Sequence, residues 1–359
     1  MIQPDHVPNR IIAQRPKDDR SKEKEPVKAV LMTTPGAPEV LQIADVPAPT
    51  LQKDTELLVR LKAAGVNPID TKLRKRGTFV PDRLPAILGC DGAGIVEAVG
   101  AGVQQFQLGD AVYFCNGGLG AHPGNYAEWA IVDARFAAHK PTSINFAAAA
   151  AAPLVLITAW EALYDRARLQ AGQRVLIHAG AGGVGHVAIQ LATLCGAEVC
   201  TTVSTEAKGV FVRDLGASQV LFYKDVDVVQ AVMQWTHGQG VDVAFDTVGG
   251  TVLGQSFAAT KFYGDVVTLL DADPTTDWKT ARTRNQRVSF ELMLLPMLKG
   301  LVAGQQAQAM ILQQCAQLID AGKLQLHVSE TFSLAEAAAA HRSLEAGSIT
   351  GKLVLLIDP

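Results

Sequence analysis

The sequence predicts an α/β protein built from an antiparallel β-barrel domain and a doubly wound parallel sheet. From Val27 onward, the first half holds short β-prone runs separated by Gly and Pro, with little helical periodicity. The second half alternates β-prone runs with helical patterns, which is typical of a parallel sheet. Between Arg174 and Lys208, a glycine cluster joins a predicted strand to a predicted helix. The length of 359 residues allows each unit its own core.

The composition is that of an ordinary globular protein, with 48% hydrophobic and 19% charged residues. A formal net charge of −3 gives no reason to expect nucleic acid or an anionic membrane as a partner. The five cysteines form no C-x-x-C pair and are odd in number, which indicates a reducing compartment without a disulfide framework. No apolar run approaches a membrane span, and the N-terminus lacks the apolar core of a signal peptide. We therefore expect a cytoplasmic protein.

The N-terminal residues 1–26 are expected to be a disordered extension, because they are polar and dense in both charges. A partner-binding arm is the alternative. The ordered barrel is then predicted to use five β-prone runs: Val27–Met32, Glu56–Leu61, Gly94–Val99, Ala111–Phe114 and Tyr126–Val132. After Pro141 the pattern becomes helical, over Ile144–Ala152 and Leu154–Leu163.

A βαβ unit begins at Val175–His178, a short apolar run that predicts a strand. Apolar residues then recur at helical spacing until Gly196, and Glu198–Val203 predicts a second strand. The turn between strand and helix fits G-x-G-x-x-G through Gly180, Gly182 and Gly185. Such glycines permit a tight turn and let backbone N–H groups approach a pyrophosphate at the helix N-terminus. Because strand, turn, helix and strand follow in the right order, we predict a dinucleotide site.

The end of the second strand indicates which dinucleotide is bound. A carboxylate in this position would bind the ribose 2′-OH of NAD, but the position holds Ser204. Ser204 and Thr205 offer hydroxyl groups and Lys208 offers a cation, a set that suits a 2′-phosphate. We therefore predict NADPH. The alternative is that Lys208 is merely solvated and that Glu206 turns inward to serve NAD.

The βα alternation continues to the end of the chain. The expected elements are strands at Gln219–Tyr223, Val241–Phe245, Asp265–Leu270 and Gly351–Ile357, with helices at Val226–His237 and Gln305–Ala321. The polar segment 271–287 is expected to be a long loop that covers an active site or contacts a partner.

Six motifs occur across the chain in one order: GVNPID (65–70), LPAILGCDGAGIVEAVG (84–100), GNYAEW (124–129), the HAGAGGVG turn, FDTVGG (245–250) and GKLVL (351–355). Together they resemble the medium-chain dehydrogenase/reductase superfamily, most closely its quinone oxidoreductase branch. The resemblance implies a GroES-like catalytic domain at 27–152 and 297–359, with a Rossmann domain at 153–296. It also implies an active site in the cleft between them and a homodimer through the cofactor domains. The apolar stretch 290–298 would lie at a subunit contact or in the core.

Zinc-dependent relatives of this superfamily supply Cys and His ligands at defined places, and this chain lacks them. It has Asn67 three residues before the motif aspartate, Asp91 after Cys90, and Leu154 near the start of the cofactor domain. Of these, only Cys90 is a plausible ligand, whereas catalytic zinc needs about three. We interpret Cys90 as a small buried residue and predict that no metal is bound.

Without a metal to polarise a carbonyl, donating hydride to an electron-poor acceptor is easier than removing it from an alcohol. We therefore predict NADPH-dependent hydride transfer to a quinone or an α,β-unsaturated carbonyl of a small-molecule substrate. Asn67 is the first candidate catalytic residue. Asp70 is expected to hold the local turn, with action as a base as the alternative. Lys72 is either an electrostatic donor to substrate or cofactor, or a surface lysine beside Arg74, Lys75 and Arg76. Tyr126 faces either the substrate or the core.

The resemblance also implies further cofactor contacts, with residues near the nicotinamide and near the adenosine. His178 and His186 flank the turn and are interpreted as structural. The predicted cofactor-binding residues are Asn67, Thr158, Gly180, Gly182, Gly183, Val184, Gly185, Ser204, Lys208, Tyr223 and Val248. Two other functions remain open: an NADPH-binding structural or regulatory protein with little turnover and, with less support, a zinc-dependent alcohol dehydrogenase.

Overall fold

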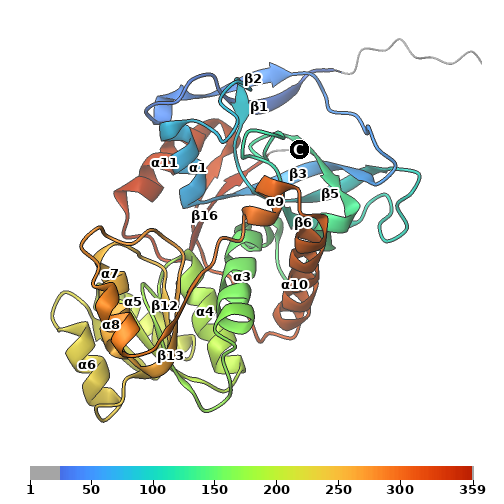
Figure 1. Cartoon of the computed structure of the whole chain (residues 1–359). Helices are drawn as coiled ribbons and strands as arrows, with labels where there is room; N and C mark the ends of the chain where they lie inside the picture. Colours follow the sequence, from blue (N-terminus) through green and yellow to red (C-terminus); the bar gives the residue numbers. More distant parts are fainter. Residues whose placement is uncertain (1–24, 358–359) are drawn as a thin grey trace, which may run out of the picture.

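The computed structural model describes residues 25–357 (Figure 1). The expected disordered extension therefore lies outside the described residues, apart from Glu25 and Pro26. The strands are β1 (Val27–Met32), β2 (Leu41–Val46), β3 (Glu56–Val66), β4 (Ala86–Ile87), β5 (Asp91–Val99), β6 (Ala111–Cys115), β7 (Trp129–Asp133), β8 (Ala137–His139), β9 (Arg174–Ile177), β10 (Glu198–Val203), β11 (Gln219–Phe222), β12 (Val241–Asp246), β13 (Thr260–Thr268), β14 (Arg287–Phe290), β15 (Val328–Ser333) and β16 (Lys352–Leu356).

The helices include eleven α-helices and a π-helical segment within residues 25–357. They are α1 (Pro68–Arg76), α2 (Phe146–Ala151), α3 (Pro153–Trp160), the π-helix η3 (Glu161–Arg166), α4 (Gly183–Leu194), α5 (Glu206–Asp214), α6 (Val228–Trp235), α7 (Thr251–Ala259), α8 (Trp278–Thr283), α9 (Leu295–Lys299), α10 (Val302–Asp320) and α11 (Ala337–Ala346). None of these helices combines the length and hydrophobicity that a bilayer crossing needs.

The half of the structure that holds the glycine turn contains a six-stranded parallel sheet in the order β11-β10-β9-β12-β13-β14. Counted from β9, this is the order 3-2-1-4-5-6 of the Rossmann fold, in which the strand order reverses between β9 and β12. Ligands bind beyond the carboxyl ends of the strands at such a reversal. The helices α4 to α8 surround this sheet (Figure 1), which confirms the predicted doubly wound architecture.

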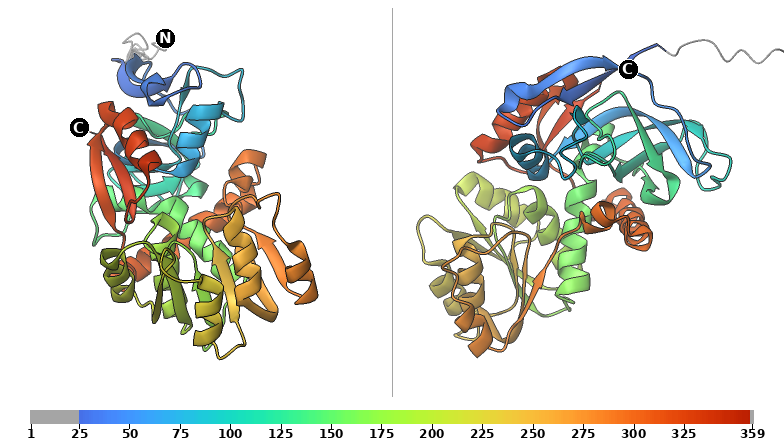
Figure 2. Two further views of the ribbon diagram at one scale, coloured as in Figure 1. Left: turned by 90° about the vertical axis from the view of Figure 1, so that its left-hand side faces the viewer. Right: turned by 45° about the horizontal axis from the view of Figure 1, so that its top comes forward.

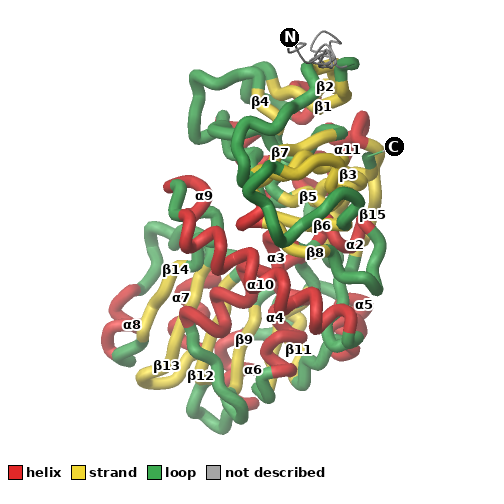
Figure 3. Tube along the Cα trace, turned by 90° about the vertical axis from the view of Figure 1, so that its right-hand side faces the viewer, coloured by secondary structure: helices red, strands yellow, loops and turns green. Residues whose placement is uncertain are grey.

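The barrel half is a seven-stranded sheet in which β15-β16-β3-β5-β6-β8 follow one another and β7 pairs with β3. All its pairs are antiparallel except β15 with β16. The C-terminal strand returns to this half, because Leu353 pairs with Val66 and Leu356 with Ala63. The red C-terminal strands and the blue N-terminal strands accordingly lie in one body in Figure 2. The six-stranded sheet forms the other body, as Figure 3 shows.

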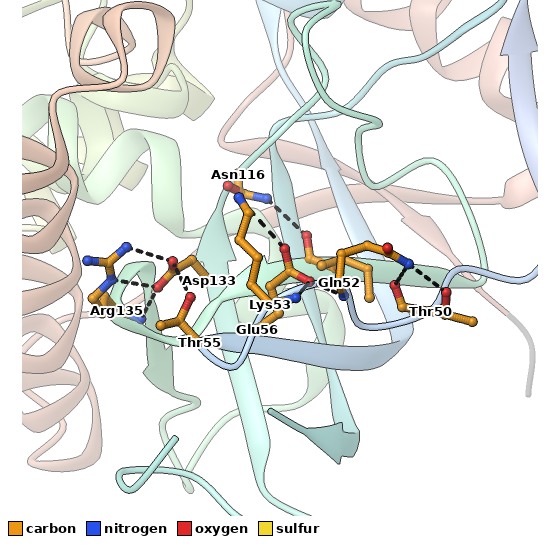
Figure 4. A network of polar contacts seen from close by, with 9 residues as sticks. Thr50, Gln52, Lys53, Thr55, Glu56, Asn116, Asp133 and Arg135 are labelled. Carbon is orange, nitrogen blue, oxygen red and sulfur yellow. Dashed lines mark hydrogen bonds and ion pairs between the residues drawn. The ribbon is translucent and has the colours of Figure 1, made fainter. Parts of the chain in front are cut away.

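A polar network fixes the start of β3 in the barrel half (Figure 4). The Glu56 carboxylate accepts hydrogen bonds from the backbone N–H of Gln52 (2.7 Å) and Lys53 (3.1 Å). The Thr55 hydroxyl donates to Asp133 across β3 and β7 at 2.9 Å. None of these residues lines the cavity described below, so we assign the network a structural role.

The expected long loop at 271–287 is wrong in part, because it contains α8. The Asp277 side chain accepts from the Lys279 N–H at 3.0 Å and so caps this helix. Trp278 packs on Phe257, with ring centroids 5.2 Å apart. A short polar helix of this kind carries no apolar periodicity that a sequence pattern would reveal.

Candidate active site

A cavity of about 420 Å³ opens between the barrel half and the parallel sheet, with mostly apolar walls. Asn67 and Lys352 reach it from the barrel, and the glycine turn reaches it from the parallel sheet. Of the predicted site residues, the cavity brings together Asn67, Lys72, Thr158, Gly182, Gly183, Val184 and Gly185. Gly180, Ser204, Lys208, Tyr223 and Val248 do not line it.

The glycine turn has the packing that its sequence pattern implies. A Cβ at Gly180 would lie 2.0 Å from the Thr201 hydroxyl oxygen. A Cβ at Gly185 would lie 2.4 Å from the Ala179 carbonyl oxygen, so only glycine fits both places. Helix α4 starts at Gly183, directly at the cavity wall. Its first-turn N–H groups have no partner within the helix, which makes this end suited to a pyrophosphate.

Asn67 stands at the centre of a buried polar network on the barrel side. Its side-chain amide donates to the Asp91 carboxylate at 2.8 Å, and its side-chain oxygen accepts from the Lys352 ammonium. Lys352 also donates to the Val66 carbonyl oxygen at 3.0 Å, and the Leu154 N–H donates to Asp91 at 2.9 Å. The Asn67 side chain is therefore held in one orientation at the cavity wall.

Burial dominates the electrostatics of this network. It raises the pKa of Asp91, an effect that the Lys352 ammonium and the Asn67 amide oppose. It also lowers the pKa of Lys352, while the Asp91 carboxylate acts in the other direction. The two groups lie 3.9 Å apart and are almost wholly excluded from solvent. Each therefore depends on the other for its charged state.

Asp70 holds the start of α1, as predicted. It accepts from the Asn67 N–H at 2.8 Å and completes a capping box with that residue. Burial raises the pKa of Asp70 to about 7. Tyr126 donates to it at 3.1 Å and is fully buried without lining the cavity, so Tyr126 is a core residue.

Lys72 is exposed on α1 and still lines the cavity, so its position is compatible with contact to a bound molecule. The alternative interpretation of Lys72 as a surface lysine grouped it with Arg74, Lys75 and Arg76, but Arg74 does not lie on the surface. Arg74 is fully buried and donates to the Gly36 carbonyl oxygen at 2.6 Å and to the Glu345 carboxylate. Lys75 and Arg76 are exposed as expected.

The predicted 2′-phosphate residues lie at the carboxyl end of β10, outside the cavity. Thr205 caps α5 and accepts from the Lys208 N–H at 3.4 Å. Partial burial and the nearby Lys224 ammonium lower the pKa of Lys208, so two cations gather here. Glu206 instead pairs with Arg213 at 2.8 Å, which does not favour the alternative in which it binds NAD.

The remaining predicted residues lie around the same edge of the sheet. Tyr223 is half-exposed after β11, and Val248 is 44% exposed in the turn that follows β12. That turn is fixed by Asp246, which accepts from the Val248 and Gly249 N–H groups at 2.9 and 2.8 Å. His178 and His186 are buried, and burial lowers the pKa of each to about 4, as suits structural residues.

Sequence reasoning missed Lys352 and Glu291, which line the cavity, and Asp91, which lies behind its wall. Each had a signal, since a charged residue within a β-prone apolar run is rarely buried without a partner. Lys352 stands in GKLVL and Asp91 in GCDGAG, both of which were singled out as motifs. Glu291 follows the edge strand β14 and its side chain is only 1% exposed.

Cys90 is buried, as predicted. Within residues 25–357, no three His, Cys, Asp or Glu side chains come together in a way that would hold a metal ion. The positions compared with zinc ligands hold Asn67, whose amide already bonds two partners, Cys90 followed by Asp91, which pairs with Lys352, and Leu154.

Comparisons with known proteins cover both halves of the chain. Residues 53–142 match the family of the alcohol dehydrogenase GroES-like domain, and residues 215–355 match the family described as zinc-binding dehydrogenase. A quinone oxidoreductase from Pseudomonas aeruginosa is 33% identical over 92% of this chain and 99% of its own length.

Solved structures agree with this assignment. An alcohol dehydrogenase superfamily protein from Novosphingobium aromaticivorans has a TM-score of 0.85 at 36% identity, covering 92% of this chain and 100% of that one. The quinone oxidoreductase of Escherichia coli, solved in complex with NADPH, has a TM-score of 0.81 at 30% identity, covering 92% and 99%. This chain belongs to the quinone oxidoreductase branch of the medium-chain dehydrogenase/reductase superfamily, a family of oxidoreductase enzymes.

Proposed function

We propose that the protein is an NADPH-dependent reductase that transfers hydride to a quinone or an α,β-unsaturated carbonyl without a metal ion. The observation that carries this proposal is one cavity that the N-terminus of α4 shares with the Asn67–Lys352 pair. Such a cavity suits a dinucleotide on one side and an acceptor on the other. The Escherichia coli relative in complex with NADPH supports the choice of cofactor.

The preference for NADPH over NADH rests on the charges at the end of β10. Lys208 and Lys224 supply two cations, and Ser204 supplies a hydroxyl group. A 2′-phosphate carries charge that these groups stabilise, whereas a free 2′-hydroxyl calls for a carboxylate. Glu206 is engaged by Arg213, so the carboxylate nearest to this position is already paired.

The side chains of the cavity position the reactants and stabilise charge. When bound, NADPH would supply hydride from its nicotinamide ring. We assign Gly182, Gly183 and Val184 to its pyrophosphate, with Thr158 and Asn67 beside the nicotinamide end. The Lys72 ammonium is the proposed donor to the acceptor oxygen, where negative charge develops during reduction.

Reduction without a metal ion is supported by the residues present. Catalytic zinc is bound by about three Cys, His or carboxylate side chains with one open position. The corresponding positions here are Asn67, Cys90 with Asp91, and Leu154. Only Cys90 is a plausible ligand, and Asp91 is already satisfied by Lys352, Asn67 and the Leu154 N–H. We infer that the Lys352 ammonium supplies, next to Asp91, the positive charge that a metal ion would supply in a zinc-dependent relative.

We also propose the domain division stated from sequence, with residues 27–152 and 297–359 forming the catalytic domain and 153–296 the Rossmann domain. We further propose that the protein is cytoplasmic and forms a homodimer. Light scattering on the purified full-length protein measures the mass of the assembly in solution, and a monomer would exclude the dimer.

A cofactor and acceptor screen tests the proposed function. NADPH and NADH are each incubated with a panel of quinones and enones, and loss of absorbance by the reduced nicotinamide is followed. Turnover well above the uncatalysed rate with NADPH, unchanged by a chelator, is the expected result. No turnover would favour an NADPH-binding protein with another role, and alcohol oxidation that a chelator abolishes would indicate a zinc-dependent dehydrogenase.

A further inference from the structure

The glycine turn that starts α4 lacks the side-chain cap that commonly fixes the first turn of a helix. Its N-cap residue is Gly182, which has no side chain to accept a hydrogen bond. Glycine has the greatest backbone freedom of any residue, so the turn has little rigidity of its own. Within residues 25–357, the N–H groups of Gly183, Val184 and Gly185 donate to no backbone acceptor. Contacts from elsewhere must therefore hold these groups in the orientation that a bound anion needs.

The His186 side chain makes such a contact in the first turn of α4. Its ring nitrogen Nδ1 lies 3.0 Å from the Gly182 carbonyl oxygen, which also accepts from the His186 backbone N–H at 3.1 Å. The other ring nitrogen, Nε2, accepts from the backbone N–H of His327 at 3.3 Å. Because a backbone N–H can only donate, Nε2 carries no proton, and the ring proton lies on Nδ1. His186 therefore donates from Nδ1 to Gly182.

This hydrogen bond fixes the direction of the next backbone N–H group. The peptide unit that joins Gly182 to Gly183 is trans, so its C=O and N–H groups point in opposite directions. The Gly182 carbonyl points into the helix toward His186, so the Gly183 N–H points away from it, beyond the N-terminus of α4. Gly182 and Gly183 both line the cavity. The ring thus holds a backbone donor in the direction along which a helix N-terminus binds an anion.

The barrel half anchors both the ring and the turn. His327 directly precedes β15, and its carbonyl oxygen accepts from the Lys352 N–H at 2.9 Å. The neighbouring Gly351 N–H donates to the Ala181 carbonyl oxygen of the glycine turn at 2.8 Å. The place where β15 and β16 begin to pair therefore holds the turn directly, through Ala181, and indirectly, through the His186 ring. These contacts take the place of the missing side-chain cap.

We propose that His186 is a positioning residue for the cofactor, which orients the Gly183 N–H toward the pyrophosphate of NADPH and is itself held by His327. The inference rests on the proposed placement of the pyrophosphate at the N-terminus of α4, and it does not depend on the identity of the acceptor. Burial lowers the pKa of His186 to about 4, so the ring is neutral at pH 7. It contributes orientation and no charge.

Two substitutions separate the two hydrogen bonds of the ring. The amide group of asparagine lies as many bonds from Cα as Nδ1 of histidine does. His186→Asn therefore retains a donor for the Gly182 carbonyl and loses the acceptor for the His327 N–H. Glutamine reaches one bond further, as far as Nε2. His186→Gln therefore retains an acceptor for His327 and loses the donor to Gly182.

The dissociation constant of NADPH, measured by calorimetry without an acceptor, is the main readout. We expect it to rise about 10-fold or more in His186→Gln, the scale of one hydrogen bond to a charged group, and to stay within about 3-fold of wild type in His186→Asn. Adenosine 2′-monophosphate carries no pyrophosphate, so both variants should bind it as wild type does. Equal NADPH affinities in the two variants would overturn the proposal, and so would an equal loss of affinity for adenosine 2′-monophosphate.

Gln190 offers a matched control one helical turn further along α4. It also bridges the two halves, since it donates to the Gln325 carbonyl oxygen at 3.0 Å and accepts from the Gln325 N–H at 2.8 Å. Its other hydrogen bond goes to the His186 carbonyl oxygen and not to the glycine turn. Gln190→Met should lower the free energy of unfolding and leave NADPH affinity unchanged. If it weakens NADPH binding as much as His186→Gln does, contact between the halves is what matters and the proposal is wrong.

Steady-state kinetics add a second readout if the wild type turns over. His186→Gln should raise the KM for NADPH and leave kcat unchanged at saturation, because the residues around the acceptor are intact. A fall in kcat with an unchanged KM would contradict a positioning role. Absence of wild-type turnover would overturn the proposed reductase function, but the dissociation constants would still test His186. Absence of NADPH binding by the wild type would overturn the placement of the pyrophosphate and this inference with it.

Discussion

Lys352 donates a hydrogen bond to the side-chain oxygen of Asn67, a residue 285 positions earlier in the chain. The pairing of β16 with β3 makes this contact possible, since it places the last strand beside the strand that ends just before Asn67. The contact lies at the cavity wall and includes Asp91 as a third member. The pairing that closes the barrel with β16 therefore also assembles the candidate site.

Lys352→Met tests this coupling through stability. The substitution leaves the Asp91 carboxylate buried without its cation, so we expect a loss of about 3–5 kcal/mol in the free energy of unfolding. Lys352→Met with Asp91→Asn removes both charges and should recover at least half of that loss. Urea unfolding of the two variants and wild type measures both values. Additive losses in the double variant would mean that the two charges do not interact.

Lys208→Ala tests the 2′-phosphate site. Loss of a charge-assisted contact of about 1.5–3 kcal/mol should weaken NADPH binding roughly 10-fold to 100-fold. Affinity for NADH should change little, because NADH has no 2′-phosphate. Titration of both nucleotides by fluorescence or calorimetry gives the ratio. Lys299→Ala, at the exposed lysine that ends α9, is the control and should leave both affinities unchanged.

Gly185→Ala tests the packing of the glycine turn. The added Cβ would meet the backbone oxygen of Ala179 at 2.4 Å and the Gly180 Cα at 2.7 Å, and neither backbone atom has room to withdraw. We expect a loss of about 1–3 kcal/mol and weaker nucleotide binding. Gly254→Ala in α7 meets nothing within 4 Å and should be neutral or stabilising by up to about 1 kcal/mol. Thermal unfolding compares the two.

Local patterns in the sequence were sufficient to predict the glycine turn and the strand and helix that flank it. Their structure depends on residues within one βαβ unit, so spacing alone carries the information. Lys208 was predictable for the same reason, since it lies one helical turn after the end of β10. Lys224 joins it only because β11 pairs with β10, and this pairing is not a local property.

The contacts missed from sequence are those made between distant segments. Nothing near Lys352 in the chain indicates that it meets Asn67, and GKLVL resembles an edge strand with an exposed lysine. Glu161 and Glu291 each interrupt an apolar run; the sequence predicted a helix for the first run and a subunit contact or core segment for the second. The π-helical geometry of Glu161–Arg166 leaves no periodicity in a segment of six residues.

Glu345→Gln tests the burial of Arg74. The guanidinium is 0% exposed, and its carboxylate partner lies on α11, so the variant leaves a buried charge without a counterion. We expect a loss of about 1–3 kcal/mol that added salt changes little. Glu39→Gln breaks the exposed Arg342–Glu39 pair and should cost under about 1 kcal/mol. If the two variants lose the same free energy of unfolding in chemical denaturation, Glu345 does not stabilise the buried Arg74.

His341→Gln tests the pH dependence that buried histidines impose on stability. Burial, with the Arg74 charge in the same direction, lowers the pKa of His341 to about 4, while Glu345 opposes it. Tyr126 faces the ring at 3.2 Å. Since the folded pKa lies below the unfolded value of about 6.5, protons bind the unfolded chain first, and stability falls as the pH drops from about 6.5 to about 4.

The wild type should therefore lose about 2 kcal/mol more than His341→Gln between pH 7 and pH 5, because glutamine takes up no proton. Other titrating groups are common to both proteins and cancel in the difference. Denaturant unfolding at the two pH values measures it. If both proteins lose the same free energy of unfolding, His341 does not contribute to the acid response. A ring that protonates freely in the folded state contributes no such difference.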